Sequence, residues 1–201
     1  MTDCTAEKNG QNGFHIAFGS IGLTNCKAFY NGASTVSNTQ GNGLYIVSAG
    51  TTGGVNVTNF RAQDNGANGV AIFGGSGETG RWTNISALIC DSNGWGHAGA
   101  LATPGTYFGL MIWDSQYMVV SGYSSFDRVV DHGAGARVTQ KNALSLNASG
   151  AGVGHHVYIR DGFHAGMVAS QDASMGAAIG TYNTTNVVNS SVTFNGATTT
   201  S

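Results

Sequence analysis

The sequence predicts an all-β fold, a single-stranded β-solenoid of about seven or eight coils with loop insertions. Two observations predict it. A two-part motif recurs along the chain at uneven intervals, which is the signature of stacked repeats. The composition, with 32 Gly in 201 residues and 9% charged residues, suits short strands and tight turns better than helices. The regular Ile, Val, Leu and Phe positions can build a packed interior, which argues against a disordered chain.

The first half of the motif begins with threonine and, in its clearest copies, an Asx residue, and it ends at an Asn-Gly pair. Its four copies begin at Thr2, Thr24, Thr58 and Thr83, contain Ala6, Ala28, Ala62 and Ala87, and end at Asn9-Gly10, Asn31-Gly32, Asn65-Gly66 and Asn93-Gly94. Equivalent residues of successive coils stack about 4.8 Å apart. We therefore expect the Asx residues Asp3, Asn25, Asn59 and Asn84 to form an internal ladder of hydrogen-bonded side chains.

The second half of the motif pairs glycine with a short apolar strand. Its copies are Asn12-Gly13-Phe14-His15-Ile16, Asn42-Gly43-Leu44-Tyr45-Ile46, Asn68-Gly69-Val70-Ala71-Ile72 and Phe108-Gly109-Leu110-Met111-Ile112. We expect glycine to supply the positive φ of a sharp corner. Extra residues should leave the coil as loops, at 33–41, 74–80 and 95–107.

Beyond Ile112 the pattern weakens but continues. Ser121-Gly122-Tyr123 matches the first half, Gly135-Ala136-Arg137-Val138 matches the second, and Val188-Asn189-Ser190 begins the last first-half copy. Residues 1–196 are therefore expected to form one β-helix domain, with 197–201 as a frayed C-terminal tail. Since Met1 begins inside a repeat, we expect the chain to be part of a longer polypeptide or assembly.

Charge and cysteine usage exclude several classes of function. The net charge is −2, which offers no basic surface for nucleic acid, and no apolar run is long enough for membrane insertion. Cys4 and Cys26 occupy equivalent positions and should be stacked, free and buried thiols. No Cys/His spacing matches a metal site, and we expect no cofactor.

Together these motifs resemble the pectate-lyase-like right-handed parallel β-helix superfamily, strongly over residues 1–112. Within it the chain is most similar to bacteriophage tailspikes, on its low charge and its Gly, Asn, Ser and Thr content. The resemblance implies a homotrimer, in a virion tail or another extracellular setting, that binds and often cuts a bacterial surface polysaccharide. It also leaves open a polysaccharide lyase or epimerase, and a non-catalytic structural or adhesive solenoid.

Hydrolysis of a glycosidic bond usually needs two carboxyl groups roughly 5–9.5 Å apart. The preferred candidates lie around the long insertion: Asp114, with Glu78 or Asp131 as its partner. Aromatic rings stack on sugars, and many tryptophans and tyrosines crowd this third of the chain, although such rings also fill cores and subunit interfaces. The expected substrate-binding residues are Trp95, His97, Tyr107, Trp113 and Tyr117.

A second catalytic candidate is an acidic column beside the Asn-Gly corner. It comprises Asp64, Asp91 and Asp127, which follow Lys8 and Tyr30 at or next to the same place in the repeat. Aspartate is also a common turn residue at such corners, so a structural role is the competing interpretation.

Overall fold

In a computed structural model the described part of the protein is rich in strands, which form mainly parallel sheets. The structure describes residues 1–17, 19–34, 36–37, 39–48, 53–74, 81–94, 107–113 and 118–126, together with short strands between 144 and 200. Across these residues it contains strands and turns and no helix. It follows that no helix of the described part has the length and apolarity to cross a membrane.

The larger sheet has eleven strands, and the strands of its main path are hydrogen-bonded in chain order. Its main path is β1 (Thr5–Glu7), β4 (Lys27–Phe29), β6 (Gly53–Gln63), β8 (Arg81–Asp91), β10 (Met118–Ser121), β13 (His156–Arg160), β17 (Ser191–Phe194) and β18 (Ala197–Thr200). Alongside this path lie β3 (Ile21–Thr24), β11 (Ser124–Phe126) and β14 (Phe163–His164). All pairs are parallel except β17 with β18, so residues 197–200, expected to fray, form an antiparallel strand.

The second sheet has five strands, all parallel. They are β2 (Phe14–Ile16), β5 (Leu44–Ser48), β7 (Val70–Gly74), β9 (Leu110–Trp113) and β12 (Leu144–Asn147). A small antiparallel pair, β15 (Ser174–Met175) with β16 (Tyr182–Asn183), completes the described strands.

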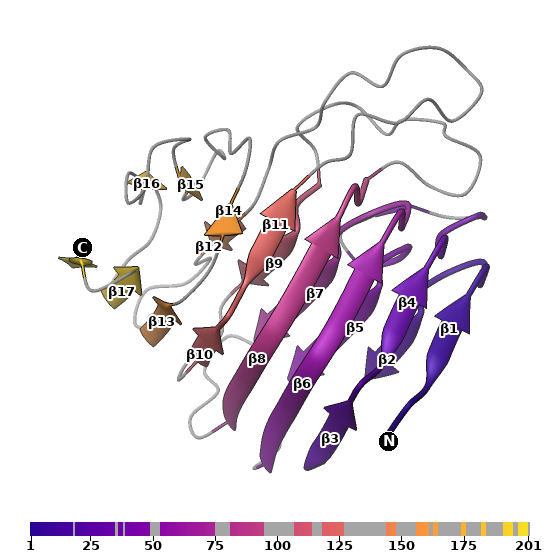
Figure 1. Ribbon diagram of the computed structural model, residues 1–201, viewed down its shortest axis with the longest axis horizontal. Helices are drawn as coiled ribbons and strands as arrows, with labels where there is room; N and C mark the ends of the chain where they lie inside the picture. The colour runs from indigo at the N-terminus through magenta and orange to yellow at the C-terminus, as the bar shows by residue number, and fades with distance from the viewer. Residues whose placement is uncertain are drawn as a thin grey trace.

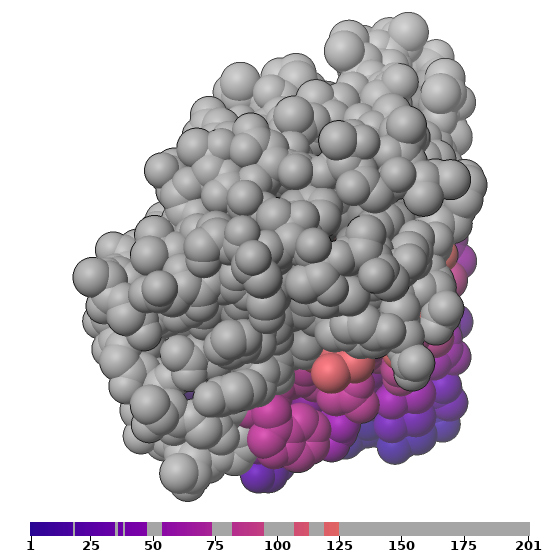
Figure 2. Space-filling model, turned by 90° about the vertical axis from the view of Figure 1, so that its left-hand side faces the viewer, coloured from indigo at the N-terminus to yellow at the C-terminus, as the bar shows by residue number. Residues whose placement is uncertain are grey.

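The chain alternates between the two sheets as it advances. In Figure 1, β1, β4, β6 and β8 lie side by side in chain order, with β2, β5, β7 and β9 behind them. Figure 2 views the molecule from the left-hand side of Figure 1, where described residues from the indigo to the salmon part of the chain reach the surface. Each pass through one sheet therefore lies directly on the preceding pass.

The register confirms the second half of the motif. Phe14, Leu44, Val70 and Leu110 are paired in one file, and Ile16, Ile46, Ile72 and Ile112 in another. The next pass is made by Leu144–Asn147, so the expected copy at 135–138, outside the described residues, is not the one that pairs with β9.

The core lies between the two sheets. It combines the inward residues of the five-stranded sheet with those of the larger one, among them Val57, Phe60, Ile85 and Leu88, all at most 1% exposed. A second cluster, formed by Tyr45, Ala71 and Met111, buries the opposite face of the five-stranded sheet. Both faces are therefore buried at β5, β7 and β9, whose strands are nearly continuous apolar runs, whereas His15 of β2 is exposed on the opposite face.

Each pass through the larger sheet bends twice at a residue with positive φ. The first bend uses Asp3, Asn25, Asn59, Ala87 and Gly122, and the second uses Lys8, Tyr30, Asp64 and Ser92. The second set is the column predicted from sequence, and Ser121-Gly122-Tyr123 is confirmed as a first-half copy by its pairing with β8. In both sets most left-handed positions are held by residues other than glycine.

The internal asparagine ladder is at the second bend, so its predicted location was wrong. Nδ2 of Asn31 donates to Oδ1 of Asn65 at 2.8 Å, and Nδ2 of Asn65 donates to Oδ1 of Asn93 at 2.8 Å. A second ladder joins Asn68 to Asn42 and Asn42 to Asn12. The predicted ladder residues Asn25 and Asn59 do hydrogen-bond, at 2.9 Å, but both are exposed.

The Thr83 copy was also aligned wrongly from sequence. Thr58 pairs with Ser86, so Ala87 is the equivalent of Asn59, and Asn84 is paired with Asn56. The small residue that follows Ala62 in the inward file is therefore Cys90. The predicted copy at 188–190 lies outside the described residues.

The glycines of the second motif half serve close packing. A Cβ built on Gly43 would lie 2.7 Å from the carbonyl oxygen of Gly69 and 2.8 Å from Nδ2 of Asn65. Gly69 is confined in the same way by Gly109 and by Sγ of Cys90. Neither has a positive φ, so the expected conformational reason does not apply to them, whereas it is confirmed at the first-half corners Gly32 and Gly94.

Cys4 and Cys26 are free thiols, as predicted, but only Cys26 is buried, whereas Cys4 is half-buried. Cys4 and Cys26 are equivalent in register, and Sγ of each donates to the carbonyl oxygen two residues earlier, both at 3.3 Å. Cys90 is fully buried, which raises the pKa of its thiol, and the neighbouring Asp91 raises it further. Cys90 Sγ donates to the carbonyl oxygen of Gly109.

Candidate functional site

The first bend of each pass turns an additional side chain outward. Along β6, Val57 is buried, Thr58 and Asn59 are both exposed, and Phe60 is buried again. The left-handed residue Asn59 resets the alternation, so that the strand can change direction without moving its apolar residues off the core. Two outward files therefore flank the inward file of Cys26, Phe60 and Leu88.

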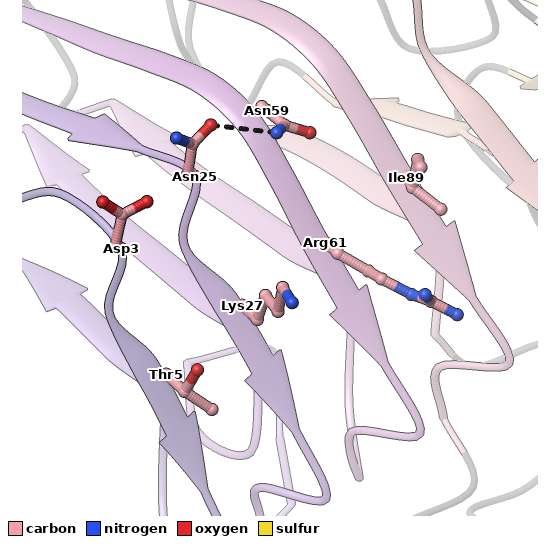
Figure 3. A pocket seen from close by; sticks show the side chains of 7 residues that line it. All are labelled: Asp3, Thr5, Asn25, Lys27, Asn59, Arg61 and Ile89. Atoms are coloured by element: carbon pink, nitrogen blue, oxygen red, sulfur yellow. Dashed lines mark hydrogen bonds between the residues drawn. The ribbon is translucent and has the colours of Figure 1, made fainter.

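These two files line a shallow groove on the outer face of the larger sheet. One side is formed by Asp3, Asn25 and Asn59, and the other by Thr5, Lys27, Arg61 and Ile89. The groove crosses four neighbouring strands and encloses about 510 Å³ (Figure 3). Its long direction follows the stacking of the strands, which are spaced about 4.8 Å apart.

The groove is polar and carries two cations at adjacent positions. Lys27 is paired in register with Arg61, so two positive charges occupy neighbouring strands. Among the described residues no carboxylate lies within ion-pair distance of Lys27, whereas Nη2 of Arg61 is 3.6 Å from Oδ2 of Asp91. Like charges at directly opposed positions repel each other. A bound anion at this point would relieve that repulsion.

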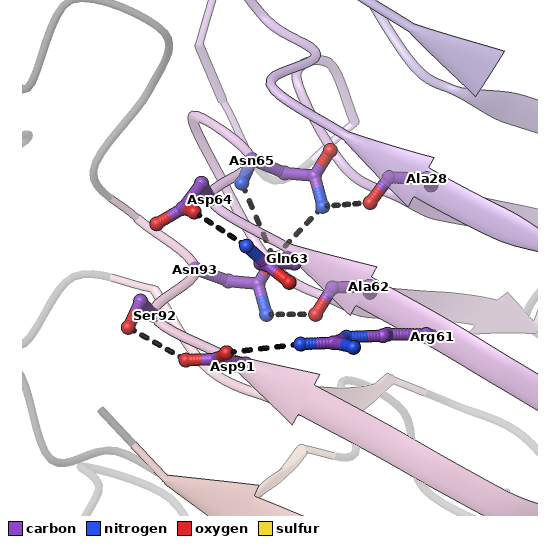
Figure 4. A network of polar contacts seen from close by, with 9 residues as sticks. All are labelled: Ala28, Arg61, Ala62, Gln63, Asp64, Asn65, Asp91, Ser92 and Asn93. Carbon is purple, nitrogen blue, oxygen red and sulfur yellow. Dashed lines mark hydrogen bonds and ion pairs between the residues drawn. The ribbon is translucent and has the colours of Figure 1, made fainter. Parts of the chain in front are cut away.

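A buried polar network lies at the second bend, beside the groove (Figure 4). Nε2 of Gln63 donates to Oδ2 of Asp64 at 3.0 Å, and Oγ of Ser92 donates to Oδ1 of Asp91 at 2.8 Å. Both carboxylates are 0% exposed. Asp64 and Ser92 are equivalent left-handed residues, and Asp91 is paired with Gln63 instead.

This arrangement bears on the acidic column predicted from sequence. Asp64 and Asp91 are brought to neighbouring strands, as expected, but they lie in different files. Each accepts a side-chain hydrogen bond, and the buried Oδ2 of Asp91 is held by its ion pair with Arg61 instead. Buried, partnered carboxylates of this kind favour the structural interpretation of the column. Asp127 lies outside the described residues, one position after Phe126, which pairs with Asp91.

Most residues of the preferred site also lie outside the described part. These are the catalytic candidates Asp114, Glu78 and Asp131 and the substrate-binding candidates Trp95, His97 and Tyr117. Trp113 ends β9, where its backbone is paired with Phe73 and Asn147. Tyr107 is 7% exposed, and desolvation raises the pKa of its hydroxyl, so it offers little ring surface to a sugar.

The sequence did not reveal the groove cations. Lys27 and Arg61 fall in different repeats, and neither is part of a recognisable motif. Aligning the alanines Ala28 and Ala62, which each follow a cation, would have placed them in one file. Among the described residues no group of three His, Cys, Asp or Glu side chains converges as a metal site would.

Comparisons with known proteins give no assignment. No family model matches the chain, and no curated protein or solved structure shows significant similarity to it. The groove and the fold are therefore the features that bear on function.

Proposed function

We propose that the chain is a right-handed parallel β-helix of the pectate-lyase-like kind that recognises a bacterial surface polysaccharide, as phage tailspikes do. The fold part of this proposal is supported by the alternation of the chain between two parallel sheets with one register maintained across passes. It is also supported by the two buried asparagine ladders, since such ladders form where equivalent residues stack pass after pass.

The observation that carries the function is the groove in Figure 3. It presents equivalent outward side chains on four successive strands, along the direction in which an extended polymer would lie. Amides and hydroxyls such as Asn25, Asn59 and Thr5 are suited to sugar hydroxyls. Lys27 and Arg61 are suited to the carboxylate or other acidic substituents that bacterial polysaccharides carry.

The described groove supplies binding groups, and hydrolysis would need carboxyl groups from elsewhere. Its single carboxylate is Asp3, whereas acid/base hydrolysis needs a pair. In the proposal the cleavage chemistry therefore rests on Asp114, with Glu78 or Asp131 as partner. The protein would act as a homotrimer, in a virion tail or extracellularly.

Binding is tested by retention of the protein on a panel of immobilised capsular and O-antigen polysaccharides. We expect retention by at least one polysaccharide, and a marked loss in the double variant Lys27→Ala/Arg61→Ala. Lys8→Asn is the matched control, because it removes a positive charge outside the groove at a left-handed position that asparagine tolerates. Retention that is equal in all three proteins, or absent for the whole panel, would overturn the proposal.

Cleavage and assembly are tested separately. Incubation with the retained polysaccharide should release oligosaccharides, and Asp114→Asn should abolish the release without affecting retention. Mass determination in solution should give three chains per particle. A monomer that releases unsaturated ends would instead indicate a lyase of the same fold.

A further inference from the structure

Trp82 lies on the outer face of the larger sheet and is exposed although it is the bulkiest side chain there. It is 46% exposed and belongs to β8, whereas Tyr107 and Tyr123, two other aromatic residues from the same third of the chain, are buried. A single exposed apolar side chain needs no explanation by itself. The residues around Trp82, however, suggest a reason for its exposure.

One face of the Trp82 indole rests on the backbone of Gly54. Gly54 is paired directly with Trp82, and a Cβ built on it would lie 2.2 Å from both Cε2 and Cζ2 and 2.8 Å from Cδ2. A point so close to all three atoms lies over the ring face, because a point beyond the ring edge would be much farther from Cδ2. One face of the indole therefore covers the Gly54 position, and the opposite face is turned away from Gly54.

Paired polar groups lie next to the ring on the same face of the sheet. Two residues along β8, Nδ2 of Asn84 donates to Oδ1 of Asn56 at 3.4 Å. Two residues farther, Oγ of Ser86 donates to Oγ1 of Thr58 at 3.3 Å. Residues two apart on a strand share a face, so the amides and hydroxyls continue the surface that the indole begins.

Two described neighbouring positions carry no large side chain over this surface. Gly22 precedes Asn56 in register, and a Cβ built on Gly22 would meet nothing within 4 Å. Val119 follows Asn84 in the same file and is 40% exposed. The result is an exposed indole with amides beside it and no large described side chain over the Gly22 position.

We infer that Trp82 is a sugar-stacking platform, which binds the apolar C–H face of a pyranose ring while Asn84 and Asn56 bind its hydroxyls. The negative face of an indole attracts the weakly positive C–H hydrogens of a sugar, and the adjacent amides fix its orientation. This inference rests on the proposed function, because it assigns to the polysaccharide a second contact away from the groove of Figure 3.

Indole NMR signals test the platform independently of any polysaccharide. The chain has three tryptophans, so the indole Nε1–H of Trp82 is assigned as the signal lost in Trp82→Phe. The probes are methyl β-glucopyranoside, methyl β-galactopyranoside and N-acetylglucosamine, each titrated into the whole protein. We expect at least one to shift the Trp82 signal in a saturable manner. If none of them shifts it, the platform does not exist.

Two glycine variants test whether the contact between the Trp82 ring and Gly54 matters for sugar binding. Gly54→Ala should displace the indole and weaken the sugar affinity measured from the shift roughly twofold to tenfold, the effect of losing one aromatic contact. Gly22→Ala adds the same methyl group where the space is empty, and should leave the shift unchanged. Equal responses of both variants would overturn the stacking geometry.

Polysaccharide retention separates this inference from the proposed function. If wild type is retained and Trp82→Ala is retained equally, the function stands and the platform is refuted. If Trp82→Ala instead dissociates a trimer, and no sugar shifts the Trp82 signal of the wild-type protein, the residue belongs to a subunit interface and the platform is again refuted.

Discussion

Two files of asparagine run along the same sheet and have opposite surroundings. The file at the second bend, Asn31, Asn65 and Asn93, is at most 6% exposed, whereas Asn25 and Asn59 at the first bend face solvent. Both bends share one backbone feature, a left-handed residue followed by a residue whose side chain points inward. Asn25 and Asn59 are themselves the left-handed residues, whereas Asn31 and Asn65 are the ones that follow.

The difference shows that position relative to the bend decides what an asparagine does. Behind the left-handed residue, an amide enters the interior and must satisfy all of its polar atoms there, as Asn65 does with Asn31, Asn93 and the carbonyl of Ala28. On the left-handed residue, the amide faces water and is available to a ligand. The inward file is therefore structural, and the outward file is the one suited to recognition.

The largest expected effect is from breaking the inward file at its centre. Asn65→Ala leaves the backbone N–H of Asn31, its amide and the carbonyl of Ala28 without their buried partner. We expect a loss of about 3 kcal/mol in the free energy of unfolding, since each buried unsatisfied group costs about 1–3 kcal/mol. Urea unfolding measures it.

Asn9→Ala is the control for that variant. Asn9 belongs to the same ladder but is exposed, and its backbone N–H still reaches Oδ1 of Asn31 after truncation. Its cost should stay below about 1 kcal/mol, the value of one ordinary hydrogen bond. Equal costs for the two variants would mean that the ladder does not carry the stability assigned to it.

A smaller loss is expected from the glycine that packs against the ladder. Gly43→Ala would place a methyl group within 3.0 Å of the Gly69 carbonyl, the Asn65 amide and the Ala62 methyl. Overpacking of this kind costs about 1–3 kcal/mol, which urea unfolding would also report. Gly22→Ala, on the outward face where space is open, should be neutral within about 0.5 kcal/mol. A neutral Gly43→Ala would show that the passes can move apart.

The comparison also explains what could be predicted from the sequence. The strand files of Phe14 and Ile16 were predictable, because glycine and an alternating apolar pattern recur there without interruption. The Thr83 copy was misaligned because Thr-Asn is frequent in this composition, while the true equivalent, Ser86-Ala87-Leu88, lacks the asparagine. Side-chain direction was assigned wrongly for Asn59, because period-two alternation gives no sign of a left-handed residue that resets it.

The outward file is interrupted at Ala87, and restoring asparagine there should stabilise the protein. Ala87 is exposed with a φ of 53°, a conformation that costs a residue with Cβ roughly 1–2 kcal/mol and that asparagine tolerates better. We expect Ala87→Asn to raise the free energy of unfolding by about 0.5–1 kcal/mol. A higher midpoint of thermal unfolding would show it. Ala28 is buried and does not belong to either asparagine ladder, so Ala28→Asn should destabilise the protein instead.

The smallest effect on stability, and the sharpest test of recognition, is expected from Asn59→Ala. The Asn59 amide makes one exposed hydrogen bond, to Asn25, so its removal should change the free energy of unfolding by less than about 0.5 kcal/mol, apart from the strain of alanine at φ 52°. Asn59→Gly avoids that strain and is therefore the better variant. If the outward file contacts a polysaccharide, Asn59→Gly should weaken retention while urea unfolding stays unchanged. Unchanged retention in Asn59→Gly would remove the amide file from the binding surface and leave the Lys27 and Arg61 file to carry it alone.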